Sequence, residues 1–155
     1  MFERGDPRHK EILGLAEMAV RGQLPDGQRT RWRDLVKELL GAEERRHYLR
    51  AAVELEVDIL SPDELASLAT SSVGAGGLAI VLDEDVPVGT DLDLSITVPQ
   101  RKVPLLAKAT VVYRRPPEIG VAFIDLIQSD RELLEGIAVK ALLSASPSGA
   151  SGAES

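Results

Sequence analysis

The stretch Leu92-Asp93-Leu94-Ser95-Ile96-Thr97-Val98 decides the class of fold. Apolar and polar residues alternate strictly along it, which is the pattern of a β-strand with one buried face. The same period of two governs residues 52–59, where the apolar members are Val53, Leu55, Val57 and Ile59. The central part of the chain, residues 51–126, is therefore expected to consist mainly of strands.

Further strand-like segments lie in this central part. Short apolar runs near 69–73 and 78–82 are separated by Gly74-Ala75-Gly76-Gly77. Longer runs cover 103–113 and 119–126, and the prolines between them indicate a loop. Several short strands at this spacing predict a small antiparallel β-barrel.

Two capping sequences predict helices within and after the β region. Ser61-Pro62-Asp63-Glu64 combines an N-cap serine, a proline at the first helical position and a glutamate at the third. It predicts a short helix through about Leu68. Ser129-Asp130-Arg131-Glu132 is a second capping box and predicts a helix of about 13 residues. The apolar residues that this second helix would bury are Leu133, Leu134, Ile137 and Leu142.

The chain before the β region has helical spacing. One segment follows Pro7 and ends around Gly22 and residues 24–27. Another runs from about Thr30 to Glu44, and Gly41 weakens its end without needing to stop it. An apolar stripe on the second helix needs a partner, which is the barrel, the other helix or another chain. The residues of this stripe are Trp32, Leu35, Val36, Leu39 and Leu40.

We therefore expect a mainly β fold with flanking helices, in three parts. Residues 1–43 form an N-terminal helical extension, and residues 44–143 form the barrel with its closing helix. Residues 144–155 contain no apolar side chain larger than alanine, so this tail is expected to be disordered.

The composition excludes several classes of function. The absence of cysteine excludes disulfides, a thiol nucleophile and cysteine-ligated metals. A net charge of −7 and only 3% aromatic residues argue against a nucleic-acid surface. No apolar run approaches the roughly 18 residues of a membrane span. The first residues are charged and do not resemble a signal sequence, so we expect a soluble, cytoplasmic protein.

Three short motifs suggest chemistry, but each has a simpler explanation. Gly74 to Ala79 fits the letters of a dinucleotide fingerprint, yet the glycines lead into a strand rather than a helix. Asp83-Glu84-Asp85 is more often a solvated turn than a cation site. Ser71 and Ser72 have no base near them in the sequence. We therefore expect no catalytic residue, metal site or cofactor.

The arginines before the first strand are more informative. Residues 29–50 carry seven Lys or Arg against four Asp or Glu, a local sum of +3 in a protein of net charge −7. The linker Arg46-His47-Tyr48-Leu49-Arg50 can fold over the mouth of the barrel. Guanidinium groups there suit phosphate contacts and stacking on a purine. The simpler explanation is a helix end whose cations favour the negative pole of the helix dipole.

Taken together, residues from about Glu44 to Leu143 resemble the PilZ domain, the bacterial receptor module for cyclic di-GMP. The family begins with an R-x-x-x-R linker, matched here by Arg46 to Arg50, with Arg45 before it. A D/N-x-S-x-x-G turn follows, at the position of residues 72–77. The later matches are Gly89, the strand end Val111-Val112-Tyr113-Arg114 and the strand Gly120-Val121-Ala122-Phe123. The resemblance implies a six-stranded barrel flanked by helices.

The turn departs from the family pattern. In the family, its Asp or Asn and its Ser make polar contacts to a guanine, and here these positions hold Ser72 and Gly74. A buried polar contact left unmade costs about 1–3 kcal/mol, so the nucleotide site is expected to be weakened or lost. The arginines are kept, which leaves phosphate and stacking contacts available. The candidate nucleotide-binding residues are Arg45, Arg46, Arg50, Ser72, Gly74 and Gly77.

The resemblance implies a non-catalytic signalling protein of the cyclic di-GMP or motility type. We expect an adaptor that acts through protein partners, with the helical stripe of Trp32, Leu35, Leu39 and Leu40 as the candidate partner surface or a homodimer contact. The alternative is a working cyclic di-GMP receptor in which Arg46 and Arg50 clamp the ligand and re-pose the N-terminal helices. Neither hypothesis implies a nucleic-acid polymer or insertion into a membrane.

Overall fold

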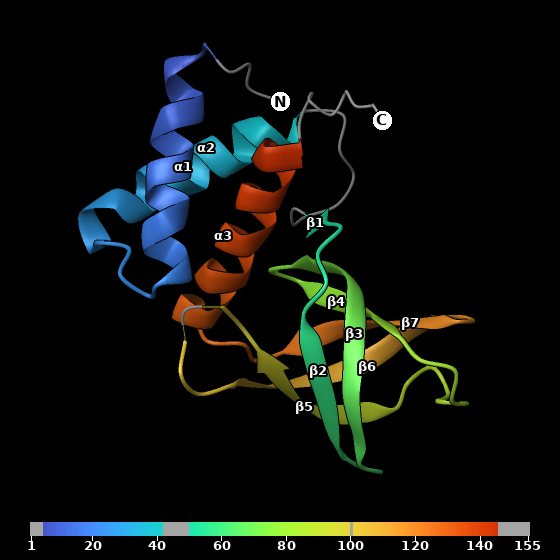
Figure 1. Ribbon diagram of the computed structural model, residues 1–155. Helices are drawn as coiled ribbons and strands as arrows, with labels where there is room; N and C mark the ends of the chain where they lie inside the picture. Colours follow the sequence, from blue (N-terminus) through green and yellow to red (C-terminus); the bar gives the residue numbers. More distant parts are fainter. Residues whose placement is uncertain (1–4, 42–49, 100, 146–155) are drawn as a thin grey trace.

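The computed structural model describes residues 5–41, 50–99 and 101–145 (Figure 1). Three helices lie together at one end of a β-barrel. The helices are α1 (Pro7–Val20), α2 (Arg29–Leu40) and α3 (Gln128–Ala145), with a short 3-10 turn at Asp26–Gln28. The strands are β1 (Arg50–Ala51), β2 (Glu56–Ser61), β3 (Leu65–Gly74), β4 (Gly77–Val81), β5 (Asp91–Thr97), β6 (Leu105–Arg115) and β7 (Glu118–Ile124).

Six of these strands close into a ring, which confirms the predicted antiparallel barrel. The order is β3-β2-β5-β6-β7-β4, and β4 pairs with β3 again to complete the circle. Closure pairs the edge strands with each other, so the barrel presents no long open edge. The two-residue strand β1 adds to the end of β3.

The barrel core is formed by the residues that the alternation marks as inward-facing. Leu92, Leu94 and Ile96 of β5 are buried, as are Val57 and Ile59 of β2. Their partners in the same core come from β3, β4, β6, β7 and the start of α3. The period of two in the sequence is therefore the direct cause of the barrel.

The short helix expected from Ser61 to about Leu68 is wrong. Ser61 ends β2, residues 62–64 form the hairpin turn, and Leu65 begins β3, where it pairs with Ile59. The side chains of Leu65 and Leu68 pack against the barrel core, and the backbone amide of Ser67 donates to Asp58 at 2.7 Å. A capping sequence provides a local preference worth about 1 kcal/mol, and ladder bonds with core packing outweigh it.

The strand expected over residues 52–59 begins later, at Glu56. Residues 52–55 connect β1 to β2 without pairing as a strand, although Leu55 is buried in the barrel core. This connection is fastened by a side chain of β3, as described below.

The helices form a second core. Trp32, Leu35 and Leu39 of α2 are buried in it together with Val36, while Leu40 lies at its margin. Their partners are residues of α1 and the C-terminal half of α3. The apolar stripe of α2 thus packs against other helices of the same chain, which answers the question of its partner that the sequence left open.

Helix boundaries also differ from the expectation. Helix α2 ends at Leu40 because Gly41 follows in a left-handed conformation with φ of +83°. The expected continuation to Glu44 lies outside the described residues. Helix α3 has 18 residues instead of about 13, since both cores bury parts of it. The tail expected from residue 144 therefore begins too early, because Ser144 and Ala145 belong to α3, and residues 146–155 lie outside the described residues.

None of the helices in the described part of the chain is long and apolar enough to cross a membrane.

Candidate functional site

Strand β1 brings the end of the arginine linker to the glycine-rich turn. Arg50 lies opposite Gly74 in the ladder, and Ala51 lies opposite Val73. The side chain of Arg50 is exposed and makes no ion pair with any described residue. Arg45 and Arg46 lie outside the described residues. The structure therefore brings Arg50 together with the predicted turn and does not address the other two arginines.

The turn connects β3 and β4 along one outer face of the barrel. Val73 and Leu78 point into the core, so the alternation places Ser72 and Ala79, which are paired, on the outer side of the sheet, where Ser72 is half-buried and Ala79 is buried. Gly74 ends β3 and Gly77 begins β4. The glycine-rich segment is thus a turn between two strands, as the simpler explanation predicts, with no helix starting at it.

Gly77 is required for a packing reason. A Cβ atom at this position would lie 2.0 Å from the backbone oxygen of Val121 on β7. Because the colliding atom is backbone, it cannot move aside as a flexible side chain would. The glycine that matches the family pattern therefore permits the close pairing of β4 with β7, and this role needs no ligand.

Tyr113 covers the same outer face from β6. A bulge between Val111 and Tyr113 shifts the register, so that Tyr113 lies opposite Gly120. The ring occupies the space above that glycine, because a Cβ on Gly120 would lie 1.9 Å from Cε2 of the ring. The guanidinium of Arg115 lies 4.8 Å from the ring centroid, within the range of a cation–π contact.

Glu118 is the acidic member of this face. The Ser71 hydroxyl donates to Oε1 of Glu118 at 2.9 Å, and the Tyr113 hydroxyl donates to Oε2 at 2.9 Å. Burial, followed by the hydrogen bond to Glu118, raises the pKa of Tyr113, so the phenol stays protonated at neutral pH. A carboxylate therefore lies beside the aromatic ring, and its charge disfavours an anion at this place.

Arg131 links helix α3 to the turn. Its Nη2 donates to the backbone oxygen of Leu126 at 3.3 Å, and its Nη1 reaches the backbone oxygen of Ala75 at 3.5 Å. Ala75 is the residue after Gly74, so a positive side chain from the C-terminal helix lies at the turn. The helix also contacts β1 and β3, which makes it the structural support of the whole site.

Sequence reasoning missed Tyr113, Glu118 and Arg131 as parts of this surface. In the sequence Tyr113 is part of a strand pattern, and the bulge that places it opposite Gly120 has no clear signal there. Glu118 and Arg131 are separated from the turn by more than 40 residues, so only the fold brings them near it. Among the described residues, no group of three or more His, Asp or Glu could hold a metal ion.

Known proteins share the barrel fold of this chain. The family model described as the PilZ domain matches residues 44–139. Among solved structures, the chain is similar to the Bacillus subtilis inhibitor of motility MotI/DgrA, with 22% identity and a TM-score of 0.58. That match covers 66% of this chain and 54% of the other, so this chain spans about half of that protein's length.

A second similar structure is the PilZ domain, with c-di-GMP, of YcgR from Escherichia coli. Its identity is 14%, its TM-score is 0.52, and the match covers 70% of this chain and 100% of that domain. At these identities the structural likeness establishes the fold. No curated protein matches the sequence.

Proposed function

Since the chain belongs to the PilZ domain family, we propose that it is a cytoplasmic signalling adaptor of the cyclic di-GMP and motility type. It acts through protein partners, and its nucleotide site is weakened or lost. PilZ domains are non-catalytic receptor modules, so the proposal assigns no reaction to the chain. The two similar structures, an inhibitor of motility and a PilZ domain with c-di-GMP, support this class of process.

The observation that carries the proposal is the chemistry of the turn and the face beside it. Gly74 lies opposite Arg50, where it offers only backbone atoms. Glu118 places a carboxylate on the same face, fixed by Ser71 and Tyr113. A ligand with two phosphates gains from Arg50 but loses a polar contact at Gly74 and approaches a negative charge at Glu118. These terms together favour weak binding or none.

The test is calorimetric titration of the purified protein with cyclic di-GMP, with GTP as the control ligand. We expect no saturable heat at micromolar ligand for the natural sequence. The double variant Ser72→Asp with Gly74→Ser restores the family's polar residues and is expected to create or strengthen binding. Adding Glu118→Gln should strengthen it further, because the substitution removes the negative charge while keeping acceptor and donor atoms.

A matched control is Glu64→Gln, which removes an exposed carboxylate from the β2–β3 hairpin turn, away from this face. It should leave every titration unchanged. Saturable micromolar binding by the natural sequence would overturn the proposal. Circular dichroism of each variant separates a lost site from a lost fold.

The alternative, a working receptor, is favoured by one observation. Arg50 is exposed, pairs with no described carboxylate and lies close enough to Tyr113 to influence its pKa. A guanidinium beside an aromatic ring can hold a phosphate and a purine together. If the natural protein binds cyclic di-GMP, Arg50→Ala should abolish binding without unfolding the barrel, whereas Lys102→Ala, also exposed, should not. Unchanged affinity in Arg50→Ala would contradict the receptor hypothesis.

A further inference from the structure

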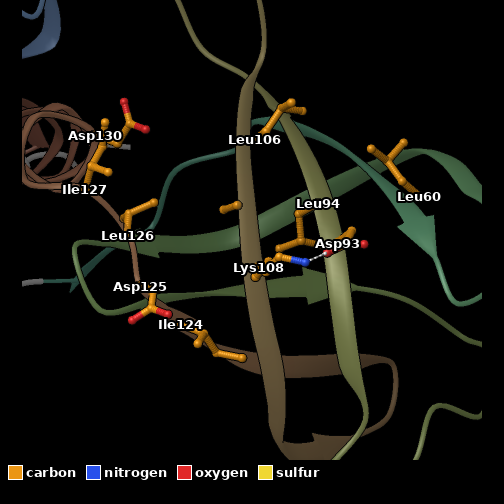
Figure 2. A pocket seen from close by; sticks show the side chains of 11 residues that line it. Leu60, Asp93, Leu94, Leu106, Lys108, Ile124, Asp125, Leu126, Ile127 and Asp130 are labelled. Atoms are coloured by element: carbon orange, nitrogen blue, oxygen red, sulfur yellow. Dashed lines mark hydrogen bonds and ion pairs between the residues drawn. The ribbon is translucent and has the colours of Figure 1, made fainter.

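A second surface of the barrel has no role in the site described above. It is a groove of about 580 Å³ on the outside of strands β2, β5 and β6, bounded by the start of α3 (Figure 2). Four large aliphatic side chains are exposed along it. Their exposed fractions are 45% for Leu60, 65% for Leu106, 36% for Ile124 and 62% for Ile127.

These side chains contribute little to the fold. On each strand the neighbouring residue fills the barrel core, as Ile59 does beside Leu60 and Leu105 beside Leu106. The alternation therefore turns the exposed residues outward, where a polar residue would be expected in a half-buried strand. A cluster of exposed aliphatic residues on a soluble domain marks a site of interaction.

Carboxylates surround the aliphatic residues. Asp93, Asp125 and Asp130 line the groove, and Lys108 is the one cation among the lining residues. Asp130 also pairs with Arg101, whose Nη1 lies 3.2 Å from Oδ1 of the carboxylate. Figure 2 shows the ion pair between Lys108 and Asp93, whose Nζ and Oδ1 atoms are 3.2 Å apart. Asp125 is exposed and forms no hydrogen bond or ion pair with the described residues. With Arg101 counted, the groove still keeps a net negative charge, and Asp125 supplies it.

The acidic character extends along the same strands. Asp91 is exposed on β5, two residues before Asp93 and therefore on the same side of the strand. Glu56 and Asp58 occupy the positions on β2 that share a face with Leu60. An occupant of the groove would therefore meet aliphatic side chains at the centre and negative charge around them.

We propose that this groove binds a basic segment of a partner protein, with aliphatic side chains entering between Leu60, Leu106 and Ile127 and Lys or Arg side chains facing the carboxylates. This inference rests on the proposed adaptor function and adds where the partner binds and what chemistry it has. Buried aliphatic anchors supply the affinity of such a contact, and charge complementarity supplies the rate and the specificity.

Two other occupants fit less well. A second copy of the chain would bring the carboxylates of both grooves face to face, which like charges disfavour. The chain's own C-terminal residues 146–155 contain no aliphatic side chain larger than alanine, and Glu154 is their one charged residue. A basic partner satisfies both the apolar and the charged parts of the groove.

The groove and the glycine-rich turn are separable by experiment. The turn uses β3 and β4 with Arg50 and Tyr113, whereas the groove uses β2, β5 and β6. Strands β6 and β7 contribute to both surfaces with different residues: Leu106 and Tyr113 lie at opposite ends of β6, and Glu118 and Ile124 at opposite ends of β7. Substitutions in one surface can therefore be made without changing the other.

The probe is a fluorescein-labelled helical peptide about 14 residues long, made of leucine at positions i, i+3 and i+4 and lysine elsewhere. Fluorescence anisotropy with the full chain should show saturable binding that weakens as salt rises. The double variant Leu106→Gln with Ile127→Gln should lower the affinity about tenfold or more. Asp93→Asn with Asp125→Asn should lower it several-fold and flatten the salt dependence.

Matched controls isolate the groove. Val112→Gln changes an exposed aliphatic residue of β6 that does not line the groove, and it should leave the affinity unchanged. A peptide with glutamate in place of lysine should not bind. No saturable binding of the lysine peptide, or equal loss in Val112→Gln and the groove variant, would overturn the proposal.

Two further readouts complete the design. Self-association that is lost in the Leu106→Gln, Ile127→Gln variant would instead identify a second copy as the occupant and overturn the basic partner. The cyclic di-GMP titrations of the same variants should equal those of the natural chain. Absence of peptide binding would therefore rule out the proposed docking groove. Saturable nucleotide binding by the natural chain would independently rule out the proposal of a weakened nucleotide site.

Discussion

Thr70 fixes the path of the chain between the arginine linker and the barrel. Its hydroxyl accepts a hydrogen bond from the backbone amide of Leu55 at 2.8 Å and donates one to the backbone oxygen of Val53 at 2.7 Å. Thr70 and Leu55 are buried and Val53 is half-buried, so the Leu55 amide in particular has no water as a replacement partner. Together with the backbone amide of Thr70, which donates to the oxygen of Leu55 at 3.0 Å, this hydroxyl fastens residues 52–55 to β3 although they do not form a strand.

We predict that Thr70→Val destabilises the protein by about 2–4 kcal/mol. Valine keeps the shape but leaves the buried amide of Leu55 and the half-buried oxygen of Val53 without the hydroxyl, at about 1–3 kcal/mol for each group. Urea unfolding measures the loss. Thr97→Val, on the exposed side of β5, is the control and should change stability by less than about 0.5 kcal/mol. A similar small change in both variants would contradict the role of the hydroxyl.

The residues of the site differ in how well the sequence predicts their positions. The family pattern points to Gly77, and the structure adds the reason, which is the oxygen of Val121 at the place of a side chain. Tyr113 and Glu118 could not be placed, because their positions depend on a bulge and on the pairing of β6 with β7. A sequence pattern describes one segment at a time, whereas a register shift depends on how two strands pair with each other.

At the scale of elements, the alternation over residues 92–98 and the capping box at residues 129–132 predicted the right elements, whereas the capping sequence at residues 61–64 did not. Residues 92–98 became β5 and its buried end because every second side chain had a core to enter. Residues 61–64 had an equally clear helix signal, yet they form the end of β2 and a turn, since the segment after them pairs with two neighbouring strands. When a short local signal competes with long-range strand pairing, the pairing therefore determines the structure.

The contact between α1 and α3 depends on one glycine. A Cβ at Gly136 would lie 3.0 Å from Cγ1 of Val20, 3.1 Å from the backbone oxygen of Ala16 and 3.1 Å from Cβ of Ala19. Only the valine of these three can turn aside. In contrast, a Cβ at Gly14, in the middle of α1, would meet nothing within 4 Å.

We therefore predict opposite effects for two helical glycines. Gly14→Ala should stabilise the protein by about 0.5–1 kcal/mol, because alanine loses less backbone entropy in a helix. Gly136→Ala has the same intrinsic gain, but overpacking between α3 and α1 should outweigh it and cost about 1–2 kcal/mol in total. Thermal unfolding of both variants measures the contrast. A rise in melting temperature for Gly136→Ala would show that the helices separate without cost.

For the whole molecule, α3 is the element that joins the two cores. Leu133 and Leu134 belong to the barrel core, while Val139 and Leu143, further along the helix, belong to the helical core. Helix α2 is tied to the same helix, because Arg29 pairs with Glu132 and Trp32 donates to Glu135. A substitution that destabilises the helical core is therefore expected to destabilise the barrel as well, because α3 belongs to both cores.

Glu135, on α3, makes the stability of the folded chain dependent on pH. Its carboxylate accepts the Trp32 Nε1–H at 2.9 Å, but burial, the largest cause, raises the pKa of Glu135 above its ordinary value. Glu132 nearby also raises this pKa, and Arg131 and Arg33 oppose the rise. Between the ordinary and the raised pKa the folded chain holds a proton that the unfolded chain has lost. Stability therefore falls as pH rises through this window and stays reduced above it.

We predict that Glu135→Gln removes this loss, since glutamine stays neutral and its oxygen can still accept from Trp32. The variant should gain stability relative to the natural chain as pH rises through the window and keep the gain at neutral pH. Glu17→Gln should act in the opposite direction, because the hydrogen bond from Lys140 lowers the pKa of Glu17 and the charged form is favoured by folding. Urea unfolding across pH, followed by Trp32 fluorescence and by circular dichroism, measures both. Equal pH profiles for Glu135→Gln and the natural chain would mean that the Glu135 carboxyl does not control stability. Separate unfolding transitions by fluorescence and by circular dichroism would mean that α3 does not couple the two cores.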